Sequence, residues 1–362
     1  MTDDRIRRFL QRTAGATTGL GPRSTFRPTH ATQSPQPTPA TELGTEGDYE
    51  LAEILGRGGM GVVYRARQPR LDRTVAVKTI RPEIGSDAAV ASFICEARVT
   101  GHLAHPNIVP VIDIGRSSVG DTFLAMKLVE GQSWEELLAD DGPVAESLFM
   151  DLDDDTAFPD SALQDLPMRV GSELEPHLEI FLSVCNAIAF AHSRGFIHRD
   201  IKPTNVMLGE FGEVLVMDWG LAVDIADERR EGRPSIVHKS EVKEPWGTPC
   251  YLAPEMAEGD GESLGPWTDV FLLGATLHEV VTRRPPHAGT NFKRILEAAR
   301  TASPPSYPDE VPAELQGILQ RAMAKDPMDR FPSVLALRDA LRGFQKHGES
   351  TRLTEAARSA AH

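Results

Sequence analysis

The segment "FIHRDIKPTNVML", residues 196–208, and the nearby "VLVMDWGLAV", residues 214–223, decide the fold. In the second stretch an apolar run predicts a strand that ends in Asp218, and Gly220 then permits a tight turn. A carboxylate carried by a strand into a turn indicates a metal-holding Asp. From the turn alone three interpretations are open: a working site, a damaged site, or a turn without a function.

A glycine-rich stretch, "LGRGGMGVVYRA", lies upstream at residues 55–66. Gly56, Gly58 and Gly61 form a G-x-G-x-x-G pattern followed by Val63, and the pattern lies between two predicted strands. Because no helix follows it, a dinucleotide-binding turn is disfavoured. The context favours a hairpin over nucleotide phosphates, where glycines let backbone N–H groups approach the oxygens. A glycine-rich turn without a ligand is the alternative.

Lys78 lies in "VAVKTI", residues 75–80. Strand alternation predicts that Lys78 shares an inward face with Ala76, whereas Val77 and Thr79 point to the other face. An inward Lys needs a partner. The phosphates of a nucleotide are one candidate, and Glu96 in the helical stretch "FICEARV" is the other. A solvated Lys and a solvated Glu are the alternative.

Hydrophobic periodicity divides the chain into a β-rich part and a helical part. Alternation predicts strands at residues 49–56, 61–68, 73–80, 107–115 and 121–129, with one helix at 87–103. Helices dominate from about residue 133, and are expected at 178–195, 267–282, 311–324 and 332–344. The apolar stripe of the first of these four runs through Leu178, Phe181, Leu182, Cys185, Ile188 and Ala189.

Composition excludes several classes of function. The chain has 362 residues, 40% hydrophobic and 25% charged, which is ordinary for a globular protein. Apolar stretches such as "VFLLGA" are too short to span a bilayer, and the N-terminus lacks the apolar core of a secretory signal. A net charge of -15 disfavours nucleic acid as a partner. Three scattered Cys match no disulfide framework or zinc site and favour a cytoplasmic location.

Three segments stand apart from this pattern. Residues 1–48 are rich in Ser, Thr and Pro and predict a disordered tail, and residues 345–362 predict a short polar tail. Residues 142–175 are dense in Asp and Glu and predict a solvated insertion. A docking segment is the alternative for this insertion, because four apolar residues interleave with its acids: Leu148, Phe149, Met150 and Phe158.

With these stretches in order, the chain resembles the protein kinase superfamily. The matching landmarks are the Gly-rich hairpin, "VAVK", the helical Glu, "HRDIKPTN", "MDWG", "GTPCYLAPE", "TDVFLLG" and "DPMDRF". The resemblance covers residues 49–344 and is nearest to bacterial relatives of eukaryotic Ser/Thr kinases. It implies an α+β, bilobal fold, with a five-stranded antiparallel β lobe and one main helix at 49–131 and a larger, mainly helical lobe at 132–344.

The resemblance also implies catalytic roles. Asp200 would orient the substrate hydroxyl, and Lys202 would meet the charge of the transferred phosphoryl group. Asn205 and Asp218 would hold Mg²⁺, with Mn²⁺ as a possible replacement. Catalysis of this kind rests on positioning and charge stabilisation.

The same resemblance implies an ATP site. Lys78 would neutralise the α- and β-phosphates and would be steadied by Glu96, so both count among the catalytic residues. At position 127, in the segment expected to join the two lobes, this chain has Lys where many members of the family have Glu. The residues expected around ATP are Leu55, Gly56, Gly58, Gly61, Val63, Ala76, Lys78, Met126, Val129 and Met207.

Several structural roles carry over in the same way. Glu255 is expected to pair with Arg330, and Asp269 is expected to brace the backbone of the catalytic loop. Thr248 is expected to contact Asp200 and Lys202. His198 is expected to be a packed spacer rather than a base, Cys250 a small filler rather than a redox-sensitive thiol, and Trp219 to dock beneath the helix that carries Glu96.

The function implied is an ATP-dependent Ser/Thr protein kinase of cytoplasmic signalling, acting on protein substrates. Arg199, beside Asp200, suggests control by phosphorylation, with Ser235 and Ser240 as acceptors and a possible dimer for autophosphorylation in trans. A pseudokinase scaffold is the alternative, but such chains usually lose the Lys or one of the two Asp. A small-molecule kinase would lack the stretch "GTPCYLAPE".

Overall fold

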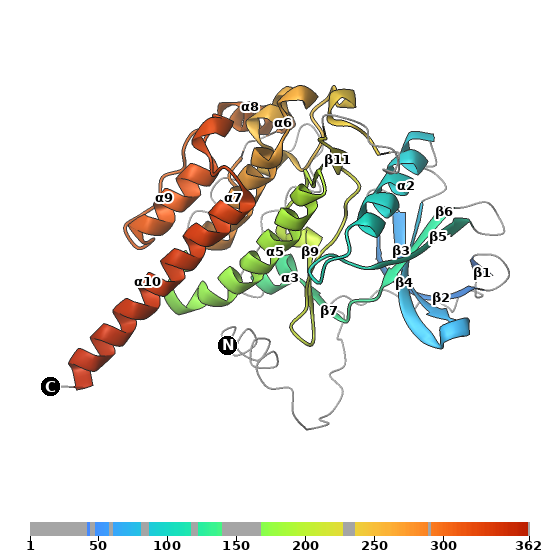
Figure 1. The fold of residues 1–362 in the computed structure, drawn as a ribbon, viewed down its shortest axis with the longest axis horizontal. Helices are drawn as coiled ribbons and strands as arrows, with labels where there is room; N and C mark the ends of the chain where they lie inside the picture. Colours follow the sequence, from blue (N-terminus) through green and yellow to red (C-terminus); the bar gives the residue numbers. More distant parts are fainter. Residues whose placement is uncertain are drawn as a thin grey trace.

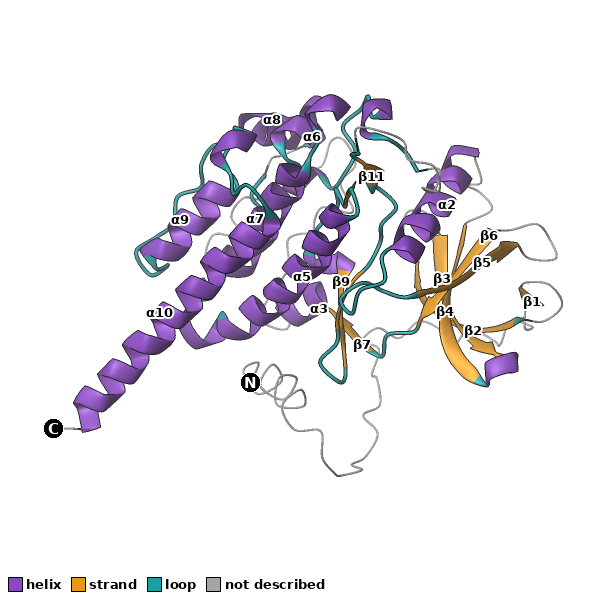
Figure 2. Cartoon of the chain, in the orientation of Figure 1, coloured by secondary structure: helices purple, strands orange, loops and turns teal. Residues whose placement is uncertain are grey.

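The computed structural model describes residues 42–43, 48–57, 61–80, 87–116, 122–139, 168–226, 236–288 and 291–360. Within these residues the chain forms a sheet-based lobe and a helical lobe side by side, as Figures 1 and 2 show. Gly58, Ser235, residues 140–167 of the acidic insertion region and most of the N-terminal stretch lie outside the described residues.

The small lobe is an antiparallel sheet with the strand order β1-β2-β3-β4-β6-β5. All five predicted strands are present, as β2 (Tyr49–Arg57), β3 (Gly61–Gln68), β4 (Arg73–Ile80), β5 (Val111–Arg116) and β6 (Thr122–Lys127). The short β1 (Glu42–Leu43), in a stretch predicted to be a tail, pairs with β2 at the edge. The predicted helix is α2 (Asp87–His102).

Both faces of β4 are covered, which corrects the expectation that only one face of this strand points inward. Ala76 packs on the α2 side, in a cluster that includes Phe93 and Met126. Val77, on the opposite face, is fully buried in a second cluster. Tyr49 and Phe123 provide that cover, with their rings in edge contact at 5.5 Å.

The large lobe is mainly helical, with short strands between its helices. Its helices are α3 (Trp134–Ala139), α5 (Glu175–Ser193), α6 (Pro254–Glu258), α7 (Pro266–Thr282), α8 (Phe292–Thr301), α9 (Ala313–Ala322) and α10 (Val334–Ala360). Its strands are β7 (Gly131–Ser133), β8 (Phe196–Ile197), β9 (Val206–Gly209), β10 (Val214–Val216) and β11 (Val223–Asp224). β9 lies between β10 and β7, and β11 pairs with β8. These short strands carry the loops of the site.

α5 is the central helix of this lobe and packs against α7 and α10 (Figure 1). The predicted stripe is buried apart from the half-buried Ala189, but Ile180, Val184 and Ala187 outside the stripe are buried too. Among the described residues, Gly171–Ser193 alone is long and apolar enough for a membrane span, but two-thirds of its most apolar window is buried within the fold. A helix at the centre of a globular core has the same properties, so this finding is weak evidence for a span.

α10 continues well past residue 344, where the sequence predicted that the helix would end. Residues 345–360, expected to be a polar tail, extend it to Ala360, and Figure 1 shows this end projecting from the lobe. Side chains near the predicted boundary reach the lobe: Gln345 donates to Glu179 over 2.8 Å, and His347 lies 3.1 Å from Glu314. Good helix formers such as Arg, Leu, Glu and Ala then allow the helix to continue.

Besides the connecting chain at residues 128–130, hydrogen bonds and an ion pair join the two lobes. Asn107, after α2, donates from Nδ2 to the carbonyl of Val214 over 3.0 Å and accepts from the amide of Val216 over 2.8 Å. Lys127 on β6 forms an ion pair with Glu213, just before β10. The strand that leads to Asp218 is therefore bonded to the small lobe.

Candidate active site

The loop at residues 198–205 is held from below by a buried carboxylate. Asp269, fully buried at the start of α7, accepts from the amides of His198 and Arg199 over 2.8 and 3.0 Å. His192 adds a third contact to it at 2.7 Å. Burial would raise the pKa of Asp269, but the hydrogen bonds from His192 and the Arg199 amide hold the pKa below its usual value. The anionic form therefore braces the loop, as expected.

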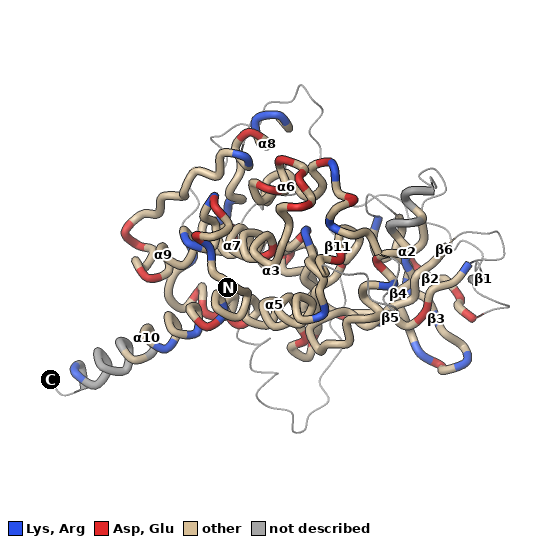
Figure 3. Tube along the Cα trace, turned by 45° about the horizontal axis from the view of Figure 1, so that its top comes forward, with Lys and Arg blue, Asp and Glu red and all other residues tan. Residues whose placement is uncertain are grey.

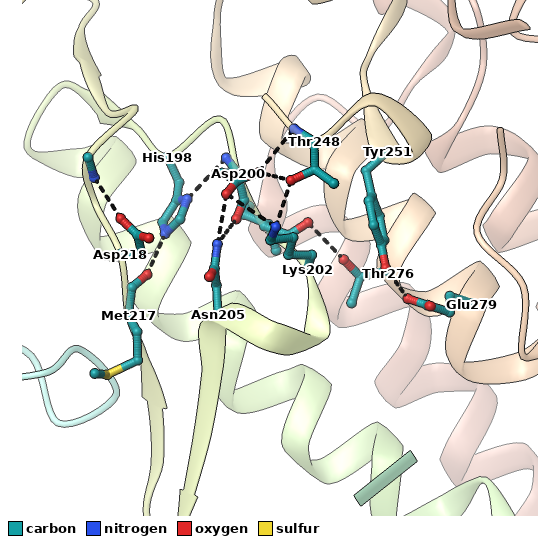
Figure 4. Close-up of polar contacts among 12 residues, drawn as sticks. His198, Asp200, Lys202, Asn205, Met217, Asp218, Thr248, Tyr251, Thr276 and Glu279 are labelled. Atoms are coloured by element: carbon teal, nitrogen blue, oxygen red, sulfur yellow. Dashed lines mark hydrogen bonds and ion pairs between the residues drawn. The ribbon is translucent and has the colours of Figure 1, made fainter. Parts of the chain in front are cut away.

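Asp200 is the centre of a hydrogen-bonded group, shown in Figure 4. Its Oδ1 accepts from the Thr248 hydroxyl over 2.7 Å, and its Oδ2 accepts from Asn205 Nδ2 over 2.9 Å. Lys202 Nζ donates to Thr248 Oγ1 over 2.7 Å and lies 3.8 Å from Asp200 Oδ2. The structure thus brings Asp200, Lys202 and Asn205 together, with Thr248 in the predicted contacts.

Asn205 and Asp218 lie beside each other because the two loops are bonded through the backbone. The amide of Met217, the residue before Asp218, donates to the Asn205 carbonyl over 2.8 Å. Since the Asn205 Nδ2 group donates twice to Asp200, its amide oxygen faces away from that residue. The Asp218 side chain is 47% exposed. One carboxylate oxygen and one amide oxygen are therefore presented together.

The charge on Asp218 suits a cation. Partial loss of hydration would raise the pKa of the Asp218 carboxyl, but nearby positive charge, chiefly that of Lys78, outweighs this effect and lowers the pKa. Carboxylate and amide oxygens are the ligands that Mg²⁺ prefers, and Mg²⁺ usually shares its coordination with phosphates and water. The donor set formed by Asn205 and Asp218 therefore fits Mg²⁺ held jointly with a nucleotide.

Lys78 and Glu96 form the predicted pair across the small lobe. Lys78 Nζ lies 2.9 and 2.7 Å from the two carboxylate oxygens of Glu96 and 3.9 Å from Asp218 Oδ1. Burial would lower the pKa of Lys78, but Glu96 and Asp218 outweigh it and raise that pKa, so the ammonium group stays charged. A fixed cation points toward Asp218 from the small lobe.

The residues expected around the adenine and phosphates fall into three groups. Val63, Ala76 and Met126 belong to one apolar cluster under the sheet. Met207 on β9 and Val129 in the connection are half-buried, whereas Leu55 and Gly56 at the end of β2 are exposed. Gly61, the first residue of β3, packs closely against the backbone of β4. A Cβ at this position would lie 2.0 Å from the carbonyl oxygen of Thr79.

Trp219 lies within the core, as its docking role requires. It is fully buried in the cluster that contains Cys95 and Val99 of α2, and its ring lies 4.5 Å from that of His198. Its indole Nε1 has no hydrogen-bond partner among the described residues. The aromatic residue of the turn therefore packs against the catalytic loop, and its docking beneath α2 stays a prediction.

His198 is packed, and it also positions the loop. Its Nδ1 accepts from the amide of Asp200 over 3.2 Å, and its Nε2 lies 3.1 Å from the carbonyl of Met217. This arrangement connects the catalytic loop to the residue before Asp218, and Figure 4 shows it between the two Asp residues. The expected spacer is therefore also a hydrogen-bonded link.

The segment from Asp218 to Glu255 is only partly described, because residues 227–235 lie outside the described residues. Arg199 is 4% exposed, donates from Nη1 to the carbonyl of Leu221 over 3.2 Å, and has its pKa lowered to about 10 by burial. The candidate acceptor Ser240 is half-buried, with its hydroxyl 2.8 Å from Nδ1 of His238. His238 Nε2 lies 3.1 Å from the carbonyl of Ala226. This histidine therefore joins the two described ends of the segment.

Two further expectations concern the large lobe. Arg330 donates to both Glu255 oxygens over 2.8 and 2.9 Å, with both side chains buried. This is the predicted long-range pair. Cys250 is 2% exposed, which agrees with the role of a packed filler.

Some contributors were missed in the sequence. Thr276 on α7 donates to the carbonyl of Ile201 over 3.1 Å, and Tyr251 donates to Glu279 (Figure 4). Met217 packs against the apolar cluster of Ala76 and Met126. Of these residues, only Met217 could have been found from the sequence, because it directly precedes Asp218. The other contacts join residues that are far apart in the chain.

The family comparison agrees with this geometry. A family model described as "Protein kinase domain" matches residues 49–340. Among curated proteins, the chain is 33% identical over 319 residues to the serine/threonine-protein kinase PknD of Chlamydia pneumoniae, covering 85% of this chain and 32% of that protein. It is 33% identical over 298 residues to the serine/threonine-protein kinase PknB of Mycolicibacterium smegmatis, covering 80% of this chain and 42% of that protein.

The relatives are thus much longer proteins. The chain spans about a third of the length of PknD and less than half of PknB. The match to the family model, residues 49–340, contains every residue of the site described above.

Proposed function

The chain belongs to the protein kinase family, and from that premise we propose that it is a serine/threonine protein kinase that transfers the γ-phosphoryl group of Mg-ATP to protein hydroxyl groups. The observation that carries the proposal is the single group formed by Asp200, Lys202, Asn205 and Thr248, with Asp218 beside it. The names of the relatives support the same activity.

ATP would lie between the lobes, with its adenine against Val63, Ala76 and Met126. Lys78, fixed by Glu96, would meet the α- and β-phosphates. Mg²⁺, or Mn²⁺ in its place, would be held by Asn205 and Asp218; when bound it neutralises phosphate charge. These residues bind and orient the donor.

The acceptor side depends on Asp200. Its carboxylate is held at both oxygens by Thr248 and Asn205, so it is fixed in position to orient a hydroxyl and to take its proton. Lys202 Nζ, 2.7 Å from Thr248 Oγ1, places positive charge where the transferred group gains negative charge. The chain forms no covalent bond with the phosphoryl group in this scheme.

The test is transfer of phosphate from labelled ATP to the chain itself and to a panel of proteins, with Mg²⁺ or Mn²⁺. Asp200→Asn and Asp218→Ala should each reduce transfer by at least about a thousandfold, since each removes a group essential to positioning or charge. Asp309→Asn, a change at an exposed acid outside the site, is the matched control and should match the wild type. Equal transfer by all four proteins would contradict the assigned roles.

Regulation by autophosphorylation is part of the proposal. Arg199 is a buried cation next to Asp200, and a phosphate on residues 229–245 would meet such a cation. Phosphosite mapping of the wild type against Lys78→Ala tests this, and identical maps would contradict it. If the rate of autophosphorylation per molecule rises with protein concentration, transfer occurs in trans through a transient dimer.

We also propose that the protein acts in the cytoplasm. Three Cys, all of them free and buried, suit a reducing compartment. Fractionation of cells that express the full-length protein tests the location. Binding of partners without any phosphate transfer would instead favour a scaffold.

A further inference from the structure

We infer that Trp246, together with Glu244, selects protein substrates that carry Arg or Lys within about three residues of the phosphorylated hydroxyl. This inference rests on the proposed kinase function and names the substrate class of the same site. It begins from an exposed tryptophan immediately before Thr248.

Trp246 differs from the other three tryptophans of the chain. Trp134 is buried and donates to His177 over 3.0 Å, Trp219 is buried in the core, and Trp267 donates to the carbonyl of Ser263 over 2.9 Å. Trp246 is 53% exposed. Its indole has no hydrogen bond among the described residues, so the exposed ring is open to contact with a ligand.

The position of Trp246 is fixed close to the acceptor site. Trp246 precedes Thr248 by two residues, which limits the Cα–Cα separation to about 7 Å, and the Thr248 hydroxyl lies 2.7 Å from Asp200 Oδ1. Gly247 between them has a φ of +140°, and a Cβ there would lie 2.7 Å from Leu252 and 2.9 Å from Met256. The backbone therefore turns at a glycine packed against the lobe, and Trp246 lies two residues from the Thr248 that is bonded to Asp200.

The residues before Trp246 are fixed as well. A Cβ on Gly259, at the end of α6, would lie 3.2 Å from Glu244 Cα and from the nitrogen of Pro245. The backbone of Glu244 therefore lies directly against α6. The carboxylate of Glu244 is exposed and has no hydrogen bond or ion pair among the described residues. An unpaired carboxylate thus lies two residues from an exposed indole.

The charge around this pair favours a cationic substrate. Figure 3 shows acidic positions gathered around α6, and the exposed acids of residues 236–262 outnumber the two lysines, Lys239 and Lys243. These acids are Glu241, Glu244, Glu258, Asp260 and Glu262. Asp260 already accepts a hydrogen bond from the Ser263 hydroxyl, and Glu241 accepts one from the His238 amide. Glu244 is therefore the carboxylate nearest in sequence to Trp246 that has no such bond among the described residues.

An exposed indole and an exposed carboxylate two residues apart together suit the side chain of Arg or Lys. The cation stacks on the indole and also meets the carboxylate, and neither neutral nor acidic side chains gain both contacts. An extended peptide advances about 3.3 Å per residue. Residues up to about three places from a hydroxyl at Asp200 can therefore reach Trp246.

The test uses synthetic peptides with one Ser acceptor and a single Arg placed in turn at each of the three positions on either side, each matched to a peptide with Gln there. For the wild type, kcat/KM for the best Arg peptide should exceed that of its Gln partner about fivefold, the combined effect of an exposed cation–π contact and an exposed ion pair. Trp246→Ala should reduce this ratio to about one to two. Trp246→Phe should keep most of it.

Two controls complete the design. Phe211→Ala removes another exposed aromatic side chain, 80% exposed between β9 and β10, and should keep the wild-type ratio. Glu244→Gln should reduce the ratio about twofold and weaken its decline with added salt, because it removes only the ion-pair part. Thermal unfolding of each variant shows whether a loss reflects the fold.

The outcomes separate the inference from the proposed function. Phosphorylation of no peptide and no protein by the wild type would contradict the kinase proposal. Phosphorylation of Arg and Gln peptides at equal rates, a preference for Leu in place of Arg, or an Arg preference that persists in Trp246→Ala would each overturn the role of Trp246 while the kinase function stands.

Discussion

Trp219 gives a sharp test of the view that the turn at Asp218 works as a metal site and that its aromatic residue only packs. The change is Trp219→Phe, which keeps a buried aromatic ring but removes the pyrrole part of the indole. We expect the variant to keep phosphoryl transfer, with an altered rate of activation, because the metal uses Asp218 and not its neighbour.

The expected change in the free energy of unfolding follows from two opposing effects. Trp219 is fully buried, so losing two buried carbon atoms costs about 2 kcal/mol, at roughly 0.8 kcal/mol for each methylene-sized group. The indole Nε1 has no partner among the described residues, and an unpaired buried donor costs about 1–3 kcal/mol, which Phe recovers. The net change should lie within about 1 kcal/mol of zero.

The measurement is urea unfolding of the wild type, Trp219→Phe and Trp219→Ala, together with phosphate transfer by each. Trp219→Ala should lose about 3–5 kcal/mol, since it removes the ring altogether. An inactive Phe variant with wild-type stability would refute the packing role. A loss above about 3 kcal/mol for Phe would mean that the indole nitrogen contributes to folding.

Three further predictions concern the large lobe. Arg330→Ala should cost about 3–5 kcal/mol in urea unfolding because it leaves the buried Glu255 unpaired, and Arg330→Met with Glu255→Met should cost much less; equal losses would contradict this. His287 is buried against Leu252 with its pKa lowered by burial to about 4, so between pH 6.5 and 4 the unfolded state binds more protons and stability falls as the pH falls. The loss at pH 5 relative to pH 7.5 should be about 2 kcal/mol from this group, and His287→Gln should flatten that part of the curve; an unchanged slope would refute the assignment. Asp269→Asn should reduce kcat more than it raises KM for ATP, because it loosens the loop of Asp200 and leaves Lys78 in place; an effect on KM alone would contradict the bracing role.

Much of the small lobe could be predicted because its strands are long enough to show alternation. β3 and β4 have the predicted bounds, and α2 differs by one residue. The covered outer face of β4 was missed because Tyr49 and Phe123 reach it from other strands, which alternation within β4 does not show.

The large lobe was less predictable for a physical reason. β8 and β11 have two residues each and α6 has five, too few to show any period. α10 was predicted to end at 344, because a polar stretch gives no apolar stripe, although its residues favour a helix.

The site residues could be predicted because their spacing in short loops carries the chemistry. Asp200, Lys202 and Asn205 lie within six positions, and the structure places them in contact. His192 and Thr276 could not be predicted, because each is far in sequence from its hydrogen-bond partner: Asp269 for His192 and the Ile201 carbonyl for Thr276. The sequence motif identifies the residues that take part, whereas the contacts that hold them in place depend on how the large lobe packs.

The backbone of the loops shows why that packing matters for activity. Arg199 and Asp218 both adopt positive φ, 69° and 51°, a conformation that non-glycine residues avoid and that surrounding contacts must impose. Asp269 holds Arg199 through its amide, and the bond from the Met217 amide to Asn205 fixes the residue before Asp218. Because both contacts come from the large lobe, weakening that lobe should relax the two Asp residues before the small lobe loses the pair of Lys78 and Glu96. Activity should therefore be lost at lower urea concentrations than the amide-exchange protection of β3 and β4 in the small lobe.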